Sequence, residues 1–123
     1  MQTVLVVEDH DDVRELIAHV LRGDGHRVVE ACTGTDALER YRWMVAANLR
    51  PDMVITDLWM PGMLGLSLIS CLRAAGCLCP ALLITGQENR EFFAEAEALD
   101  IATMGKPLDL DALRRAVATA PAR

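Results

Sequence analysis

Short apolar segments alternate along this chain with longer segments whose apolar residues recur at helical spacing, and this alternation constrains the fold more than any other feature. The apolar segments predict strands at Val4–Val7, Arg27–Ala31, Met53–Thr56, Ala81–Ile84 and Ile101–Met104. The periodic segments predict helices from Asp12 to Leu21, Ala37 to Val45, Leu64 to Ala74, Glu88 to Leu99 and Asp109 to Ala118. Strands joined through helices pair in parallel, and right-handed crossovers place the helices on both faces of the sheet. We therefore predict an α/β fold with one doubly wound, five-stranded parallel sheet.

One face of each predicted helix carries the apolar residues expected to pack against the sheet. In chain order these are Val13, Leu16, Ile17, Val20 and Leu21; Ala37, Leu38, Tyr41, Met44 and Val45; Leu68, Ile69 and Leu72; Phe92, Ala96 and Leu99; and Leu110, Leu113 and Val117. The chain has 123 residues, of which 52% are hydrophobic, and this is the size and apolar content of one domain over residues 1–123.

The charge balance of the chain argues against one large class of partner. The formal net charge is −6, and lysine and arginine form no cluster. A surface that follows nucleic-acid phosphates needs such a cluster, so we expect no direct binding of nucleic acid. The chain also shows no basic leader with a long apolar stretch and no run of membrane-spanning length. These features predict a cytoplasmic protein that does not enter a membrane.

The cysteines do not indicate a metal site or a disulfide framework. They are Cys32, Cys71, Cys77 and Cys79, and their spacing fits neither a zinc site nor a C-x-x-C pair. A chain that can build a normal core does not need disulfides for stability. We therefore expect reduced and mostly packed thiols.

Polar side chains follow the predicted strands at the points where the strands end. Asp57 comes directly after the buried central strand, Glu8 and Asp9 follow the first strand, Thr85 follows the fourth and Lys106 follows the fifth. The carboxyl ends of parallel strands meet at one edge of the sheet, where ligand crevices form in open α/β folds. Three carboxylates, one hydroxyl and one ammonium are thus expected to converge there.

This set of side chains suits phosphoryl chemistry. Close carboxylates repel one another unless they bind a proton or a hard cation such as Mg²⁺, which takes oxygen ligands. Glu8, Asp9 and Asp57 are the candidate ligands. Lys106 and Thr85 can contact phosphoryl oxygens, and Asp57 can attack phosphorus as the nucleophile. The alternative is an acidic loop rim with Lys106 as an ordinary ion-pair partner.

Four segments together resemble the receiver (response-regulator) domain of two-component signalling, in its chemotaxis-regulator-like form. They are VLVVEDHDDVREL, PDMVITDLWMPGMLG, ALLITG and MGKPLDLDAL, and they extend over the whole chain. The resemblance implies a flavodoxin-like fold with strand order 2-1-3-4-5 and five helices in three α/β/α layers. It further implies that Asp57 accepts a phosphoryl group from a histidine kinase or a histidine phosphotransfer protein, and that a downstream protein reads the result.

The resemblance also assigns the remaining site residues. Mg²⁺ would be bound by Asp9, Asp57 and the backbone carbonyl of Trp59, with Glu8 acting directly or through water. Thr85 would be the switch hydroxyl, and Lys106 would contact the phosphoryl group. The bond from Lys106 to Pro107 would be cis.

Several residues depart from the family's usual pattern. Thr103 stands where an inward-swinging aromatic residue is common, Gly86 replaces a small alanine, and Leu108 follows Lys-Pro where phenylalanine is frequent. The sequence therefore predicts phosphorylation of the site more clearly than it predicts how a partner would detect the phosphorylated state. Trp59, with Gln87 opposite, is expected to limit the access of water to the acyl phosphate.

Three other classes of protein are alternatives to a phosphorylated receiver. A haloacid-dehalogenase-type hydrolase needs a second aspartate where this chain has Trp59, so we expect no enzymatic turnover. A dinucleotide-binding domain needs a glycine fingerprint after the first strand, where this chain is acidic. A degenerate receiver that acts as a phosphorylation-independent interaction module stays open. The kinase, the output target, the oligomeric state (a homodimer included) and the presence of further domains are not encoded in these features.

Overall fold

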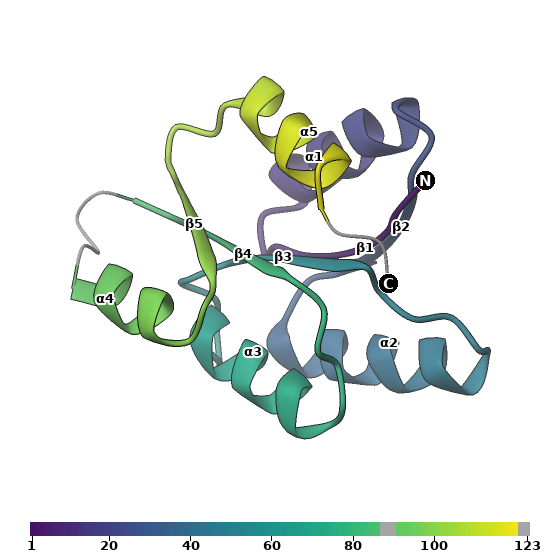
Figure 1. Cartoon of the computed structure of the whole chain (residues 1–123), viewed down its shortest axis with the longest axis horizontal. Helices are drawn as coiled ribbons and strands as arrows, with labels where there is room; N and C mark the ends of the chain where they lie inside the picture. The colour runs from purple at the N-terminus through teal and green to yellow at the C-terminus, as the bar shows by residue number, and fades with distance from the viewer. Residues whose placement is uncertain (87–90, 121–123) are drawn as a thin grey trace.

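Five parallel strands form a single sheet in the order β2-β1-β3-β4-β5 (Figure 1). The computed structural model describes residues 1–86 and 91–120. The strands are β1 (Thr3–Val7), β2 (Arg27–Ala31), β3 (Met53–Asp57), β4 (Ala81–Thr85) and β5 (Ala102–Gly105). This confirms the predicted flavodoxin-like fold class and strand order. Each observed strand lies within one or two residues of its predicted range.

Helices cover both faces of the sheet and make the three expected layers. They are α1 (Asp11–Gly23), α2 (Gly34–Ala46), α3 (Gly65–Ala74), α4 (Glu91–Ala98) and α5 (Leu110–Ala118). Figure 1 shows α1 and α5 on one side of the sheet and α2, α3 and α4 on the other. Two of the helices begin at side-chain caps, because Thr33 accepts from the amide of Asp36 and Asp109 from the amide of Ala112. The predicted start of the fourth helix, residues 88–90, lies outside the described residues.

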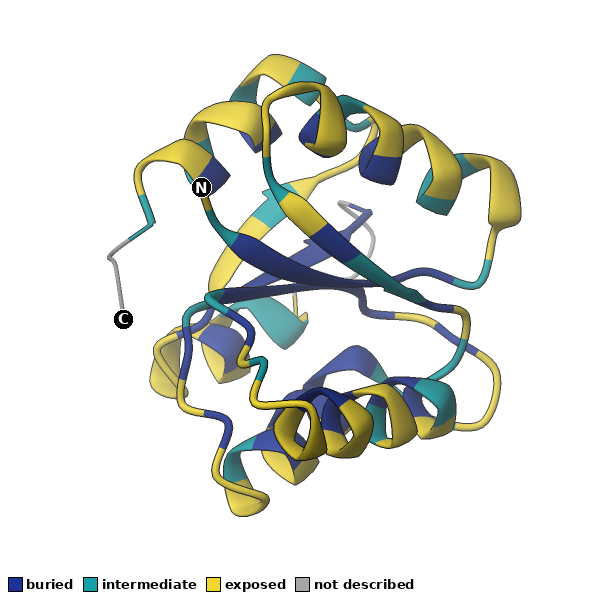
Figure 2. Cartoon of the chain, turned by 90° about the vertical axis from the view of Figure 1, so that its right-hand side faces the viewer, coloured by how far each residue is buried: buried dark blue, intermediate teal, exposed yellow. Residues whose placement is uncertain are grey.

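The core is divided between the two faces of the sheet because successive side chains of a strand point to opposite sides. On one face Val6, Ile55 and Ile84 pack with Ile17 of α1 and Leu113 of α5. On the other face the strand residues pack against α2, α3 and α4 in two further clusters. The strands β1, β3 and β4 are buried along their whole length, whereas β5 and the outer sides of the helices are exposed to solvent (Figure 2).

Some residues predicted to face inward are exposed. Leu16, Val45 and Leu99 are exposed large apolar side chains, and Trp43 is 60% exposed. Leu16 and Val45 lie at the borders of the apolar stripes of α1 and α2, where a small rotation of the helix decides burial. Leu99, predicted to lie inside the fourth helix, instead follows the last residue of α4. On α1, Ala18 is buried while Leu16 is not. Helical spacing therefore predicts the centre of a buried stripe better than its margins.

The cysteines divide into two pairs. Cys77 and Cys79 are buried, with Sγ atoms 3.5 Å apart, whereas Cys32 and Cys71 are exposed, so the expectation of mostly packed thiols holds for two of the four. No disulfide joins the cysteines in the structure. In the described part of the chain, none of the helices combines the length and the apolarity that crossing a membrane requires.

Candidate functional site

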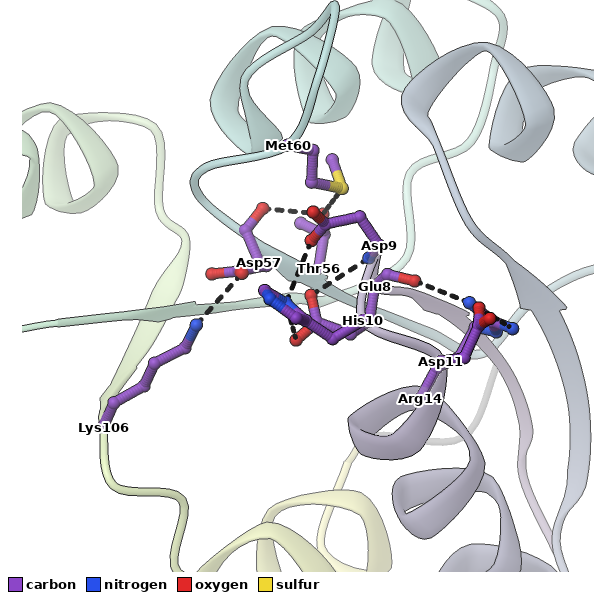
Figure 3. Close-up of polar contacts among 9 residues, drawn as sticks. All are labelled: Glu8, Asp9, His10, Asp11, Arg14, Thr56, Asp57, Met60 and Lys106. Carbon is purple, nitrogen blue, oxygen red and sulfur yellow. Dashed lines mark hydrogen bonds and ion pairs between the residues drawn. The ribbon is translucent and has the colours of Figure 1, made fainter.

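The register of the sheet brings the acidic residues together at its carboxyl edge. Val7 of β1 pairs with Thr56 of β3, so Glu8 and Asp57 follow on neighbouring strands. Both are nearly enclosed, with Glu8 4% and Asp57 5% exposed. Figure 3 shows Glu8, Asp9, Asp57 and Lys106 gathered around this edge. The structure thus confirms the predicted convergence of these strand-end side chains.

Burial and mutual repulsion perturb the carboxyl group of Glu8. Desolvation is the largest cause, followed by the negative charge of Asp57 and a hydrogen bond to it, and together they raise the pKa of Glu8 from 4.5 to about 8. The ammonium of Lys106 opposes this shift. A carboxyl group in this position binds a proton near neutral pH unless another cation takes its place.

The carboxylate of Asp9 is poised to bind a cation. Its Oδ1 atom is buried, accepts no hydrogen bond among the described residues and lies 3.5 Å from Nδ1 of His10. Glu8, Asp9 and His10 each offer a ligand atom, and these atoms lie within 4.8 Å of one another. Buried acceptors without donors are costly, and a hard divalent cation satisfies them. The donor set therefore fits Mg²⁺, although His10 is largely exposed at the N-cap of α1 and is not the oxygen ligand that this ion prefers.

Lys106 reaches the site from the end of β5. Its Nζ atom lies 3.0 Å from Oδ2 of Asp57, and its backbone N–H donates to the carbonyl of Thr85. The bond to Pro107 is cis, as the resemblance implied. The side chain of Lys106 is 40% exposed while that of Asp57 is 6% exposed, so the ammonium lies between the buried carboxylate and solvent.

Thr85 is fully buried at the end of β4, one position beyond Ile84, the strand partner of Asp57. Its hydroxyl lies 3.5 Å from the carbonyl of Gly86. Thr85 therefore stands next to the strand that carries the central carboxylate.

The loop after Asp57 is anchored at both ends. Met60 is buried beside the hydroxyl of Thr56, and the amide of Gly65 donates to the carbonyl of Leu58. A Cβ atom at Gly65 would lie 2.2 Å from the backbone oxygen of Asp57, a distance that real atoms do not reach. A glycine at position 65, the last residue of the segment PDMVITDLWMPGMLG, is thus required by the close approach of α3 to the end of β3.

Trp59 lies on this loop and is 52% exposed. Its ring packs edge-on against Phe92 of α4, with centroids 5.7 Å apart and planes at 90°. Gln87, predicted to lie opposite Trp59, is outside the described residues. Trp59 therefore links the loop beside Asp57 to α4.

Arg14 supports the site, and the sequence reasoning did not identify it. Its guanidinium donates to the backbone carbonyl of Glu8 and pairs with Asp11 (Figure 3). It also pairs with Glu30 of β2. These contacts tie the acidic turn after β1 to α1 and β2. The three-residue spacing of Asp11 and Arg14 on one helix was the available signal, but the contact with Glu8 arises only in the folded chain.

Together these groups can bind and react with a phosphoryl group. A buried carboxylate lies beside an ammonium, and carboxylate oxygens suited to a hard cation lie next to both. In such a site, positive charge neutralises phosphoryl oxygens while a carboxylate attacks phosphorus.

Comparison with known proteins agrees with this geometry. Residues 4–118 match the family model described as the response regulator receiver domain. The chain is 26% identical over 117 residues to sporulation initiation phosphotransferase F of Bacillus subtilis, covering 94% of this chain and 90% of that protein. It is 35% identical over 116 residues to the regulator of RpoS of Escherichia coli, where it covers 93% of this chain but 33% of the relative. Several relatives are thus about three times as long as the matched part.

Solved structures share the fold. The chemotaxis protein CheY4 of Vibrio cholerae superimposes with a TM-score of 0.84 at 27% identity, covering 98% of this chain and 99% of that one. The receiver domain of the hybrid histidine kinase CckA gives a TM-score of 0.76 at 29% identity, covering 94% and 95% of the two chains.

Proposed function

This chain belongs to the response regulator receiver domain family of two-component signalling, and from that premise we propose that it carries its signal as a phosphoryl group on Asp57. The observation that carries the proposal is the buried Asp57 carboxylate with the Lys106 ammonium 3.0 Å away and Glu8 and Asp9 alongside. We further propose that residues 1–123 form a single receiver unit.

The phosphoryl donor in this proposal is the phosphohistidine of a histidine kinase or a histidine phosphotransfer protein. An oxygen of the Asp57 carboxylate forms a bond to phosphorus while the bond from phosphorus to the imidazole nitrogen breaks, and the leaving imidazole takes up a proton. Lys106 binds a phosphoryl oxygen and stabilises the charge that develops there. The exposure of Lys106 supports this role, because an incoming donor must meet the site from the solvent side.

Glu8, Asp9, Asp57 and the backbone carbonyl of Trp59 are the proposed Mg²⁺ ligands. The buried Oδ1 of Asp9 without a hydrogen-bond partner and the crowded carboxyl of Glu8 support the assignment. When bound, Mg²⁺ supplies positive charge that reduces the repulsion between the carboxylates and an incoming phosphoryl group.

Thr85 is the proposed switch residue. Its position next to the strand partner of Asp57 supports movement of its hydroxyl toward a phosphoryl oxygen, which would bias β4 and the segment after it toward a second arrangement. A downstream protein then distinguishes the two arrangements. Trp59 stands where a hydrolase of the rival type needs an acidic residue, which supports a signalling role without turnover.

The test is phosphorylation by a small donor. The protein is incubated with Mg²⁺ and acetyl phosphate, and its intact mass is measured beside Asp57→Asn and a matched control, Asp12→Asn, which changes an exposed aspartate of α1. We expect one added phosphoryl group in the wild type and the control, and none in Asp57→Asn or after chelation of the metal. An adduct that persists in Asp57→Asn would place the modification elsewhere. No adduct in a protein that binds Mg²⁺ would contradict the proposal and favour the phosphorylation-independent module.

A further inference from the structure

An apolar cavity of about 250 Å³ lies beneath the carboxylate cluster. It is on the side of the sheet that α1 and α5 cover, the arrangement of helices seen in Figure 1. Its floor is formed by Val6, Ile55 and Ile84, which are buried neighbours on three adjacent strands. Ile17 of α1 and Leu108, in the segment between β5 and α5, line it as well. The cavity therefore extends from the polar edge into the space between the sheet and the helices.

The sequence explains why this space is left unfilled. Deeper in the same layer, Leu21, Leu113 and Val117 are completely buried and close the packing. Toward the polar edge the strands give way to Glu8 and Asp57, whose polar carboxyl ends do not pack well against an apolar helix. Leu108 and Val13 are only half-buried at this end, and neither is large enough to close the gap.

We propose that this cavity is a binding site for a small, neutral aromatic molecule that carries one hydroxyl group, of the size of phenol. An apolar cavity of about 150 Å³ is enough to admit benzene, so this one has room for a substituted ring. Its apolar floor favours a ring over a sugar or an amino acid, because polar groups there would lose their hydrogen bonds to water.

The mouth of the cavity sets the position of the hydroxyl group. Glu8, Asp57 and Lys106 line it, and Lys106 already pairs with Asp57. A polar side chain at this end can therefore exchange a hydrogen bond with a ligand hydroxyl, whereas the carboxylate side chains, with no cation bound among them, disfavour an anionic ligand. A ring bound there would contact the same side chains that the phosphoryl group is proposed to use.

The test is a titration of the isotope-labelled full chain with phenol, followed by amide NMR shifts in buffer without Mg²⁺ or phosphodonor. Binding is thereby measured independently of phosphorylation, so failure of one proposal does not affect the other. We expect saturable shifts at Val13, Ile17 and Leu108. Benzoate, which has the same ring with a negative charge, is expected to bind at least about tenfold more weakly.

Two cavity-filling variants and one matched control complete the experiment. Leu108→Phe fills the space from the segment before α5, and Val13→Phe fills it from α1, so a folding defect in one leaves the other informative. Leu78→Phe makes the same change at a site that is 64% exposed and remote from the cavity. We expect each filled variant that folds to bind phenol about tenfold more weakly or worse, and the control to bind like the wild type. Unsaturable shifts, shifts scattered outside the cavity, tighter binding of benzoate, or unchanged binding in a folded cavity-filling variant would each overturn the proposal.

Discussion

One member of the central ion pair, Asp57, ends β3 and the other, Lys106, directly follows β5, and these two strands are packed very differently. Every residue of β3 is buried, whereas in β5 only Met104 is even half-buried. β3 has a hydrogen-bonded strand on each side, whereas β5 is an edge strand paired with β4 alone. Asp57 therefore extends from the most enclosed part of the sheet, and Lys106 from the least enclosed.

This difference suits the proposal that the β3 side holds the reacting groups in place while the β5 side responds to phosphorylation. A nucleophile and its metal ligands need fixed positions, which a central strand with both faces covered provides. An edge strand with few buried side chains can shift at low cost in free energy, so the response to phosphorylation is expected on the β5 side. Thr103 is exposed on β5, in agreement with a readout that does not use an inward-swinging aromatic residue.

The largest expected contrast comes from adding one methyl group near each strand. Gly65→Ala forces a Cβ against the backbone oxygen of Asp57 and is expected to lower the free energy of unfolding by about 3 kcal/mol. Gly105→Ala at the end of β5 places its Cβ 4.0 Å from the carbonyl oxygen of Thr85, an ordinary van der Waals contact, and is expected to change stability by less than about 0.5 kcal/mol. Urea unfolding measures both. Equal effects would show that the two strand ends are packed alike.

A second contrast concerns the pH dependence of stability in metal-free protein. Unfolded Glu8 loses its proton near pH 4.5, whereas the folded chain retains it up to a pKa of about 8. The unfolded state therefore binds fewer protons in this range, and stability falls as pH rises from about 4.5 to about 8. Glu8→Gln removes this loss, so its stability advantage over the wild type is expected to grow by a few kcal/mol as pH rises across the range.

The matched control for this prediction is Glu95→Gln on the exposed side of α4. Urea unfolding of all three proteins at several pH values in the presence of a chelator gives the comparison. A parallel pH dependence in wild type and Glu8→Gln would mean that Glu8 is not the group responsible. Addition of Mg²⁺ is expected to reduce the slope in the wild type, because a bound cation competes with the proton.

Replacing threonine by valine on each strand gives a smaller contrast. The hydroxyl of Thr56 is buried and donates to the carbonyl of Asp57 at 3.0 Å, so Thr56→Val is expected to cost about 1 kcal/mol. Thr103→Val on β5 changes an exposed side chain and is expected to alter stability by less than about 0.5 kcal/mol. Thermal unfolding of the two variants checks the order. A larger cost at Thr103 would contradict the picture of a loosely packed edge.

The smallest expected effect concerns the contact between Trp59 and Phe92, which connects the loop after β3 to α4. If the indole ring limits the access of water, Trp59→Asn is expected to speed dephosphorylation of Asp57 about threefold. Trp43→Asn, at an exposed tryptophan of α2, is the control. The decay of the phosphorylated protein, followed by intact mass, measures both rates. An unchanged rate in Trp59→Asn would remove the shielding role.

Local pattern was enough to predict most of the fold. The apolar runs predicted each strand to within one or two residues. The margins of the helical stripes were not predictable, because Leu16 is exposed through the way α1 sits on the sheet and Leu99 lies beyond the end of α4. The exposure of Trp43 is likewise not evident from its neighbours in the sequence.

For the candidate site, the sequence by itself determined which chemical groups stand at the strand ends, because hydrophobic periodicity specifies where a strand stops and a parallel sheet collects those ends at one edge. Only the tertiary structure decided how these groups interact. The perturbed carboxyl of Glu8, the unsatisfied Oδ1 of Asp9, the contact of Arg14 with the acidic turn and the cavity under Leu108 each depend on atoms far apart in the chain. Burial and electrostatic interaction depend on distances in three dimensions, and the order of residues does not contain those distances.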